Sequence, residues 1–153
     1  MKNFALILIL SISSNYIFAQ DNITLTLEIE NINSYDTRLY VGIYDSKKDF
    51  KNKSHAIDSV IVIPKTKTIK LTFNIKHAGI YAAAGFQDLN NNKKLDTGIF
   101  GIPIEPVCVS DYQHKPKSPP TFRKSEFMLK SDTTIIMPLM SGNKEIEKLE
   151  KKL

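Results

Sequence analysis

The chain has 153 residues, of which 42% are apolar, 24% charged and 9% aromatic, and its formal net charge is +5. This balance is typical of one globular domain, and it excludes a disordered chain, a collagen-like repeat and a multidomain enzyme. Cys108 is the only cysteine, so a disulfide framework within the chain is excluded as well.

Residues 1–19 have the pattern of a secretory signal peptide. Lys2 supplies a positive charge, an unbroken apolar stretch runs from Phe4 to Leu10, and Ala19 precedes the expected cleavage site. The apolar stretch is shorter than the roughly 20 residues that a membrane-spanning helix needs. We therefore expect an exported protein (periplasmic, cell-surface or secreted) with no transmembrane segment after cleavage.

Residue alternation predicts β-strands through most of the remaining chain. The predicted strands are 23–29, 38–44, 59–63, 69–75, 79–86, 125–129 and 133–139. In the first and fourth of these strands, apolar and polar residues alternate, which predicts one buried face and one solvent-exposed face. The fifth is apolar or small on both faces, which predicts a central strand. The last two are expected to form a pair through a turn at residues 130–132.

About seven strands separated by turns predict an all-β fold, an antiparallel β-sandwich of the immunoglobulin-like or prealbumin-like kind. Residues 20–140 are expected to form this domain. The charged C-terminal tail, 141–153, places Ile146, Leu149 and Leu153 on one side of a short helix.

The sequence has two basic clusters. The first follows the second predicted strand and consists of Lys47, Lys48, Lys51 and Lys53. The second lies near a proline-rich loop and consists of Lys115, Lys117, Arg123 and Lys124. Neither cluster combines a recognition helix with interleaved aromatic residues, so no nucleic-acid partner is expected. The clusters indicate either a solvated surface or a weak contact with anionic glycans or lipids.

The segment 88–96, DLNNNKKLD, follows the predicted central strand and resembles the first nine positions of a calcium-binding loop. Oxygen-bearing side chains stand at positions 1, 3, 5 and 9, and the carbonyl at position 7 can add a backbone oxygen. The expected Ca²⁺ ligands are Asp88, Asn90, Asn92, the Lys94 carbonyl and Asp96, with Glu105 as a candidate to complete the shell. Leu95 is expected to point away from the ion and anchor the loop on the core.

Two positions differ from such loops. Position 6 is Lys93, where glycine favours a sharp turn, and position 12 is Ile99, where a bidentate glutamate belongs. With two charged ligands, a dissociation constant on the order of 0.1–1 mM is expected. The alternative is an asparagine-rich turn without metal, because asparagine tolerates left-handed conformations and caps its own turns.

The runs GIYAAAGFQDLNNNKKLDTGIFGIPIEP and PPTFRKSEF resemble a secreted bacterial family catalogued as domain of unknown function 2141, and the resemblance spans residues 23–139. The matching positions are Gly79, Tyr81, Ala82, Asp88, Asn90, Asn92, Leu95, Asp96, Gly101, Ile102, Pro103, Glu105, Ser110, Pro120 and Phe122. The resemblance implies an exported β-sandwich module and supplies no established activity.

The Gly101–Glu105 segment has two interpretations. Its glutamate is either a ligand of the loop ion or a structural acceptor for loop amides, and the structural interpretation is favoured.

No catalytic pattern is present, and we expect the protein not to be an enzyme. His55, His77 and His114 lack metal-binding spacing, and Cys108 has no adjacent base. A hydrolase that uses the pair Asp88 and Asp96 is the least favoured alternative.

Two binding functions remain open. A glycan-binding module would need aromatic platforms, for which the candidates are Tyr81, Phe86, Phe100, Tyr112 and Phe122. A cell-envelope interaction protein needs no special residue. In either case the calcium loop is expected to support the binding surface.

Overall fold

The computed structural model describes residues 22–98, 101–110 and 120–140. The predicted signal peptide, 1–19, and the predicted helical tail, 141–153, lie outside these residues, as do Ile99, Phe100, Tyr112 and His114. Within the described part, no helix is both long enough and apolar enough to cross a membrane.

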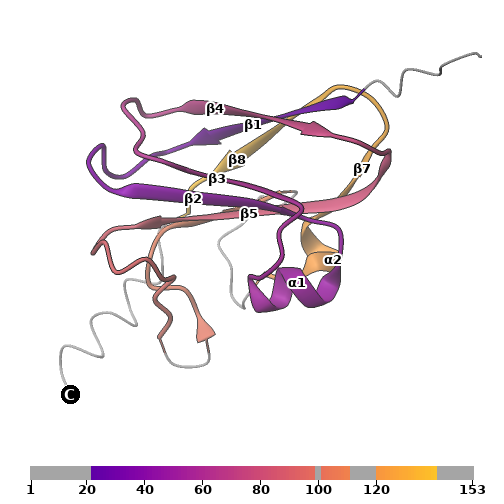
Figure 1. Cartoon of the computed structure of the whole chain (residues 1–153). Coiled ribbons are helices and arrows are strands. Elements are labelled where there is room, and N and C mark those ends of the chain that lie inside the picture. The colour runs from indigo at the N-terminus through magenta and orange to yellow at the C-terminus, as the bar shows by residue number, and fades with distance from the viewer. Residues whose placement is uncertain (1–21, 99–100, 111–119, 141–153) are drawn as a thin grey trace, which may run out of the picture.

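Eight strands and two short helices make up the described chain (Figure 1). The strands are β1 (Ile23–Glu30), β2 (Arg38–Tyr44), β3 (Asp58–Val62), β4 (Ile69–Ile75), β5 (Gly79–Asp88), β6 (Val107–Val109), β7 (Glu126–Leu129) and β8 (Thr133–Pro138). The helices are α1 (Lys47–Asn52) and α2 (Phe122–Ser125). All seven predicted strands are confirmed, and the three-residue β6 is an addition.

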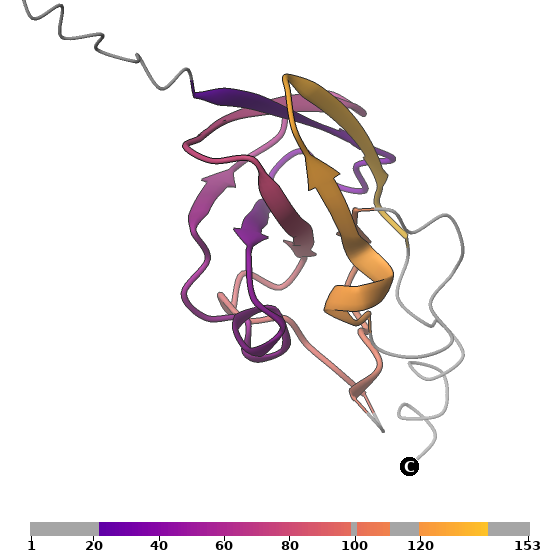
Figure 2. The ribbon, with the colours of Figure 1, turned by 90° about the vertical axis from the view of Figure 1, so that its right-hand side faces the viewer.

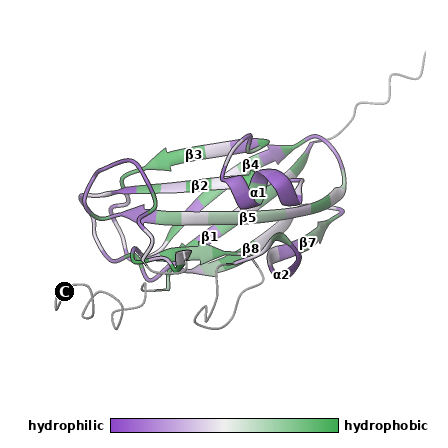
Figure 3. Ribbon diagram, turned by 90° about the horizontal axis from the view of Figure 1, so that it is seen from below, coloured by the Kyte–Doolittle hydropathy of each residue, from purple (hydrophilic) through white to green (hydrophobic). Residues whose placement is uncertain are grey.

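The strands form two facing sheets, so the fold is mostly β and sandwich-like (Figures 1 and 2). One sheet has the order β4-β1-β8, and the other has the order β3-β2-β5-β6, with β7 also paired to β5 (Figure 3). We call the second one the five-stranded sheet. β5 lies inside it, as predicted, because it pairs with β2 along one edge and with β6 and β7 along the other.

The prediction of a purely antiparallel fold with a final β7–β8 pair is wrong in both respects. β8 pairs with β1 in a parallel arrangement, whereas β7 pairs with β5. The chain therefore crosses from one sheet to the other at residues 130–132. Asp132 supports this crossing, because its Oδ1 accepts the backbone N–H of Thr24 at the start of β1 (2.8 Å).

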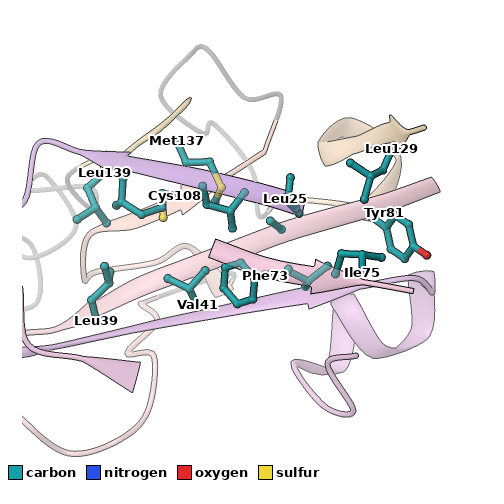
Figure 4. Packing of buried hydrophobic residues seen from close by; sticks show 14 of the residues in the cluster. Leu25, Leu39, Val41, Phe73, Ile75, Tyr81, Cys108, Leu129, Met137 and Leu139 are labelled. Atoms are coloured by element: carbon teal, nitrogen blue, oxygen red, sulfur yellow. The ribbon is translucent and has the colours of Figure 1, made fainter. Parts of the chain in front are cut away.

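The core lies between the two sheets, and its side chains come from both (Figure 4). β1 contributes Leu25, Leu27 and Ile29, which are fully buried and face β2 and β5 across the layer. These are the apolar positions of the alternating pattern, so the period of two along β1 is explained by its single buried face.

Ser110 fills the gap where β6 ends and β7 begins along the same edge of β5. Its Oγ accepts the backbone N–H of Ala83 (2.8 Å) and donates to the carbonyl oxygen of Ser125 (2.5 Å). The side chain thus replaces a ladder bond at Ala83, the residue of β5 that lies between its pairings with β6 and β7. All three residues belong to the buried interior.

Helices α1 and α2 cover one end of the outer face of the five-stranded sheet (Figure 1). Phe50 of α1 makes edge-to-face contacts with Tyr44 of β2 and with Phe122 of α2, at ring-centroid distances of 5.5 and 5.9 Å. α1 begins at an N-cap, Ser46, whose Oγ accepts the Asp49 N–H (3.2 Å). This local signal, Ser46-x-x-Asp49, predicts the helix that the analysis of apolar periodicity missed.

Candidate functional site

The loop 88–96 begins with a buried carboxylate at the end of β5. Asp88 has no exposed surface. Its Oδ1 accepts the N–H of Asn92 (3.1 Å), and its Oδ2 accepts the N–H of Lys93 (2.8 Å). The side chain therefore folds the loop back on its own first residue.

The next oxygen-bearing side chains continue the same pattern. Asn90 Oδ1 accepts the N–H of Asn92 (3.1 Å), and Asn92 Oδ1 accepts the N–H of Lys94 (2.9 Å). The side-chain amides of both asparagines donate to the carboxylate of Asp96, at 2.6 to 3.0 Å. Positions 1, 3, 5 and 9 of the predicted ligand set are thus held within one hydrogen-bonded loop.

Two residues of the loop adopt left-handed backbone conformations. Asn91 has φ 59°, and Lys93 has φ 66°. Lys93 stands at the position where glycine was expected, and it makes the sharp turn with a side chain that disfavours this conformation. Arg38 of β2 supports the turn from outside, because its Nη1 donates to Asn91 Oδ1 (3.3 Å).

Glu105 clamps the two ends of the loop. Its Oε1 accepts the N–H of Leu89 (2.8 Å), and its Oε2 accepts the N–H of Asp96 (3.0 Å). Its side chain is buried, and this desolvation raises its pKa, an effect that the two N–H bonds partly oppose. The hydrogen bonds to loop amides that the structural interpretation of Glu105 predicts are present. This carboxylate therefore clamps the loop.

The segment between the loop and β6 folds back against the loop. The N–H of Ile104 donates to the Asp96 carbonyl (2.9 Å), and Thr97 forms an isolated antiparallel bridge with Pro103. Gly101 makes the turn with φ 71°, in the region that glycine tolerates best. These backbone bonds bring Glu105 back to the loop despite the sixteen residues that separate it from Leu89.

A groove of about 460 Å³ lies on the outer face of the five-stranded sheet, between the helices and the loop. We call it the outer groove. Its lining includes Tyr40, Gly42, Ala84, Phe86 and Val109 from the strands. Leu95 also lines it and belongs to neither buried cluster, so the prediction that Leu95 anchors the loop on the core is wrong.

Tyr40 and Phe86 form the aromatic part of the outer groove. The two residues are direct cross-strand partners, and their rings stack at a centroid distance of 4.8 Å with an interplanar angle of 5°. Phe86 was among the predicted aromatic candidates, and Tyr40 was not. The sequence feature that could have identified Tyr40 is the apolar character of both faces of residues 38–44, which predicts that both faces of this strand are covered.

The other described aromatic candidates are structural. Tyr81 belongs to the core, and its hydroxyl donates to the carbonyl of His77 (2.8 Å). Phe122 belongs to the second apolar cluster, under α1. Neither offers a platform for a ligand.

The Cys108 thiol and the grouping of metal-binding side chains are the remaining features of the described residues that bear on chemistry. Cys108 is fully buried in the core, and burial raises its pKa to about 12. Among the described residues, no three or more His, Cys, Asp and Glu side chains are grouped so as to hold a metal ion. Any cation on the loop would therefore depend on asparagine and backbone oxygens besides Asp88 and Asp96.

Comparison with known proteins identifies the family. Neither the curated proteins nor the solved structures that were searched gave a match. The sequence model of a family described as "Uncharacterized protein conserved in bacteria (DUF2141)" matches residues 27–137, from β1 to β8 and including the loop, Glu105 and the outer groove. The chain belongs to this bacterial family, DUF2141.

Proposed function

We propose that this chain is an exported, non-enzymatic β-sandwich module that binds its ligand in the outer groove. The observation that carries the proposal is an aromatic and small-residue surface left open on the outside of a sheet. The groove volume of about 460 Å³ falls within the roughly 300–1,000 Å³ of small-molecule sites. Export rests on the predicted signal peptide, and the partner is expected in the cell envelope.

An enzymatic role has less support. A hydrolase would need one of the two aspartates to reach a substrate, but Asp88 has no exposed surface and accepts two backbone N–H bonds. Asp96 accepts bonds from two side-chain amides. These contacts suit a folded loop better than a pair of catalytic carboxylates.

A glycan ligand also has less support than an apolar one. Sugars bind to aromatic rings that present an open face. In the outer groove, Tyr40 and Phe86 stack on each other, so each ring shields one face of its partner. Their edges and the neighbouring glycine and alanine positions favour an alkyl or aromatic ligand.

We further propose that Ca²⁺ stabilises the loop that forms one wall of this groove. The oxygen donors of Asp88, Asn90, Asn92 and Asp96, together with the Lys94 carbonyl, suit a hard cation. Glu105 supports this ligand set by holding the backbone N–H groups of Leu89 and Asp96 at the two ends of the loop. A bound ion would fix the positions of the groove residues next to Asp96, which are Leu95 and Thr97.

Thermal unfolding of residues 20–153 tests the calcium proposal. The melting temperature is measured with a chelator and then with millimolar Ca²⁺ or Mg²⁺. At ten times the dissociation constant, Ca²⁺ stabilises the folded state by about 1.4 kcal/mol. Asp96→Asn is expected to lose this increase, whereas the exposed control Asp58→Asn keeps it. No increase in the wild type would contradict the proposal and identify the loop as a metal-free turn.

Binding of the neutral dye N-phenyl-1-naphthylamine tests the groove. We expect saturable one-to-one binding with enhanced emission, lost in Ala84→Phe, which fills the groove floor. Ser59→Trp blocks the rim from an exposed position and covers the case in which Ala84→Phe misfolds. Ala78→Phe, exposed and outside the lining, is the matched control. A wild type that shows no saturable dye binding would overturn the groove as a ligand site.

A further inference from the structure

The charged side chains that line the outer groove have one sign. Among its described lining residues, the ionisable side chains other than tyrosine are Lys51, Lys53 and His55. No aspartate or glutamate belongs to this described lining, although the chain has 16 acidic residues. The groove thus combines an apolar floor with a basic rim at the α1 end.

We infer that the outer groove binds an anionic amphiphile, a saturated fatty-acid carboxylate, with its chain along the sheet and its carboxylate near Lys51 and Lys53. This inference rests on the proposed function and names the ligand class of the same site. At roughly 30 Å³ for a group the size of a water molecule, which is close to that of a methylene, the 460 Å³ of the groove corresponds to about 15 such groups. A medium-length alkyl chain therefore fits the space.

The floor of the groove is largely apolar because small and aliphatic residues stand on the outward face of β2, β5 and β6. Gly42 and Ala84 are direct cross-strand partners. The Tyr44 ring lies over Gly42, where a Cβ atom would approach the Tyr44 hydroxyl oxygen to 3.0 Å. Val107 and Val109 of β6 extend this surface. Neither small residue offers a side-chain hydrogen-bonding group, so the floor suits methylene groups.

The basic rim is held in place by the end of α1. Lys53 caps the helix in a left-handed conformation (φ 53°), and its N–H points to the carbonyl oxygens of Asp49 and Phe50. Phe50 is itself buried against Tyr44. The backbone that carries both lysines is therefore anchored to the sheet, while their ammonium groups remain exposed.

One acidic side chain, Asp49 of α1, contacts the basic rim at His55. Asp49 accepts a bond from the Ser46 hydroxyl (2.5 Å), and its other oxygen lies 3.4 Å from His55 Nδ1. These contacts lower the pKa of Asp49, the hydrogen bond to Ser46 first. Asp49 therefore keeps its negative charge beside His55, and Lys51 and Lys53 together outweigh this single carboxylate at the α1 end of the groove.

The two parts of the groove have different effects on binding. Burial of the alkyl chain provides most of the affinity, because the hydrophobic effect scales with the apolar area removed from water. Exposed lysines add little affinity, but they discriminate by sign between an anionic, a neutral and a cationic headgroup. Headgroup selectivity is therefore the property that separates this inference from general apolar binding.

Displacement of the neutral dye by a homologous series tests the ligand class. Octanoate, decanoate and dodecanoate are compared below their micelle-forming concentrations, and each added methylene is expected to strengthen binding about fourfold. Decanoate is then compared with decan-1-ol and decyltrimethylammonium, and the expected order is carboxylate, alcohol, ammonium. Equal or stronger displacement by the alcohol or the ammonium compound would overturn the inference.

A charge-matched pair of variants assigns the selectivity to the rim. Lys51→Gln/Lys53→Gln is expected to reduce the carboxylate-to-alcohol affinity ratio towards one, chiefly by weakening carboxylate binding. Lys65→Gln/Lys67→Gln removes the same charge from exposed positions outside the groove lining and should keep the wild-type ratio. An unchanged ratio in the first variant would overturn the assignment.

The two proposals fail in distinguishable ways. A wild type that binds the dye, but prefers the alcohol or shows no headgroup preference, contradicts only the fatty-acid inference. A wild type that binds neither the dye nor an alkyl ligand contradicts the proposal that the groove is a ligand site.

Discussion

The Glu105 carboxylate accepts the backbone N–H of Asp96 at 3.0 Å, and this bond joins the end of the loop 88–96 to the strand region that follows it. The second oxygen of the same carboxylate accepts the N–H of Leu89. One buried side chain therefore holds both ends of the loop and fixes the wall of the outer groove.

Glu105→Ala is expected to destabilise the fold by about 2–4 kcal/mol, because it leaves two loop N–H groups without an acceptor. Glu105→Gln keeps one acceptor oxygen and should cost less, about 1–3 kcal/mol. Urea denaturation of both variants checks the order. If Glu105→Ala were as stable as the wild type, the carboxylate would not be the clamp that its two bonds indicate.

The stability of the protein should also depend on the ionisation of Glu105. Burial raises the pKa of this carboxyl above its ordinary value of 4.5. The folded state therefore binds a proton more tightly than the unfolded chain, and the contribution of this group to stability falls as pH rises from the ordinary pKa through the raised one. Lowering the pH from about 7 to about 5 should stabilise the wild type relative to Glu105→Gln.

Urea denaturation at several pH values checks this difference between the two proteins. The Gln variant cannot titrate at this position, so it serves as the reference for all other groups. A difference that stays constant or changes in the opposite direction would contradict the prediction.

Gly85→Ala should destabilise the fold by about 1–3 kcal/mol through overpacking. A Cβ atom at this position would lie 2.8 Å from the Tyr40 carbonyl oxygen and 3.0 Å from the sulfur of Cys108. Thermal unfolding of Gly85→Ala and Gly85→Ala/Cys108→Ala, with Cys108→Ala as reference, separates the two contacts. Removal of the sulfur should not abolish the cost, because the closest atom belongs to the backbone of β2. Full relief in the double variant would contradict this explanation.

Ser110→Ala should cost about 1–3 kcal/mol, because the buried N–H of Ala83 loses its acceptor. Ser110→Thr keeps the hydroxyl and separates the loss of the bond from a change in volume. Hydrogen exchange at the Ala83 amide provides a local readout. Exchange that remains as slow as in the wild type would contradict the assignment of this bond.

Cys108 should resist alkylation in the folded protein. Its sulfur is buried, and its pKa of about 12 keeps it protonated at neutral and mildly basic pH. Iodoacetamide labelling, followed by mass spectrometry, should be slow in buffer and complete in urea. Labelling at the same rate in both would show that the core around β6 is open.

The strands were predictable because their signal is local. In β1 and β4 each apolar residue faces the core and each polar neighbour faces water, so alternation along a few residues is sufficient. The three-residue β6 was missed because Val107, Cys108 and Val109 are too short a run to show a period. The helix α1 was missed because its signal is a cap at Ser46 rather than an apolar stripe.

The candidate site was predictable only in part, for the same reason. The loop 88–96 and its oxygen-bearing side chains are contiguous in sequence, so their grouping follows from spacing. The structural role of Glu105 also followed from its chemistry. The outer groove was not predictable, because Tyr40 and Phe86 meet through the register of two strands that are far apart in the chain.

The sequence by itself determined the strand segments, the central place of β5, the loop and the family. Only the tertiary structure decided that β8 joins β1 in a parallel pair, that Ser110 bridges the gap between β6 and β7, and that an aromatic groove lies outside the five-stranded sheet. The physical reason is that alternation reports whether a side chain is buried, whereas strand pairing and sheet coverage depend on contacts between distant residues, which no local pattern encodes.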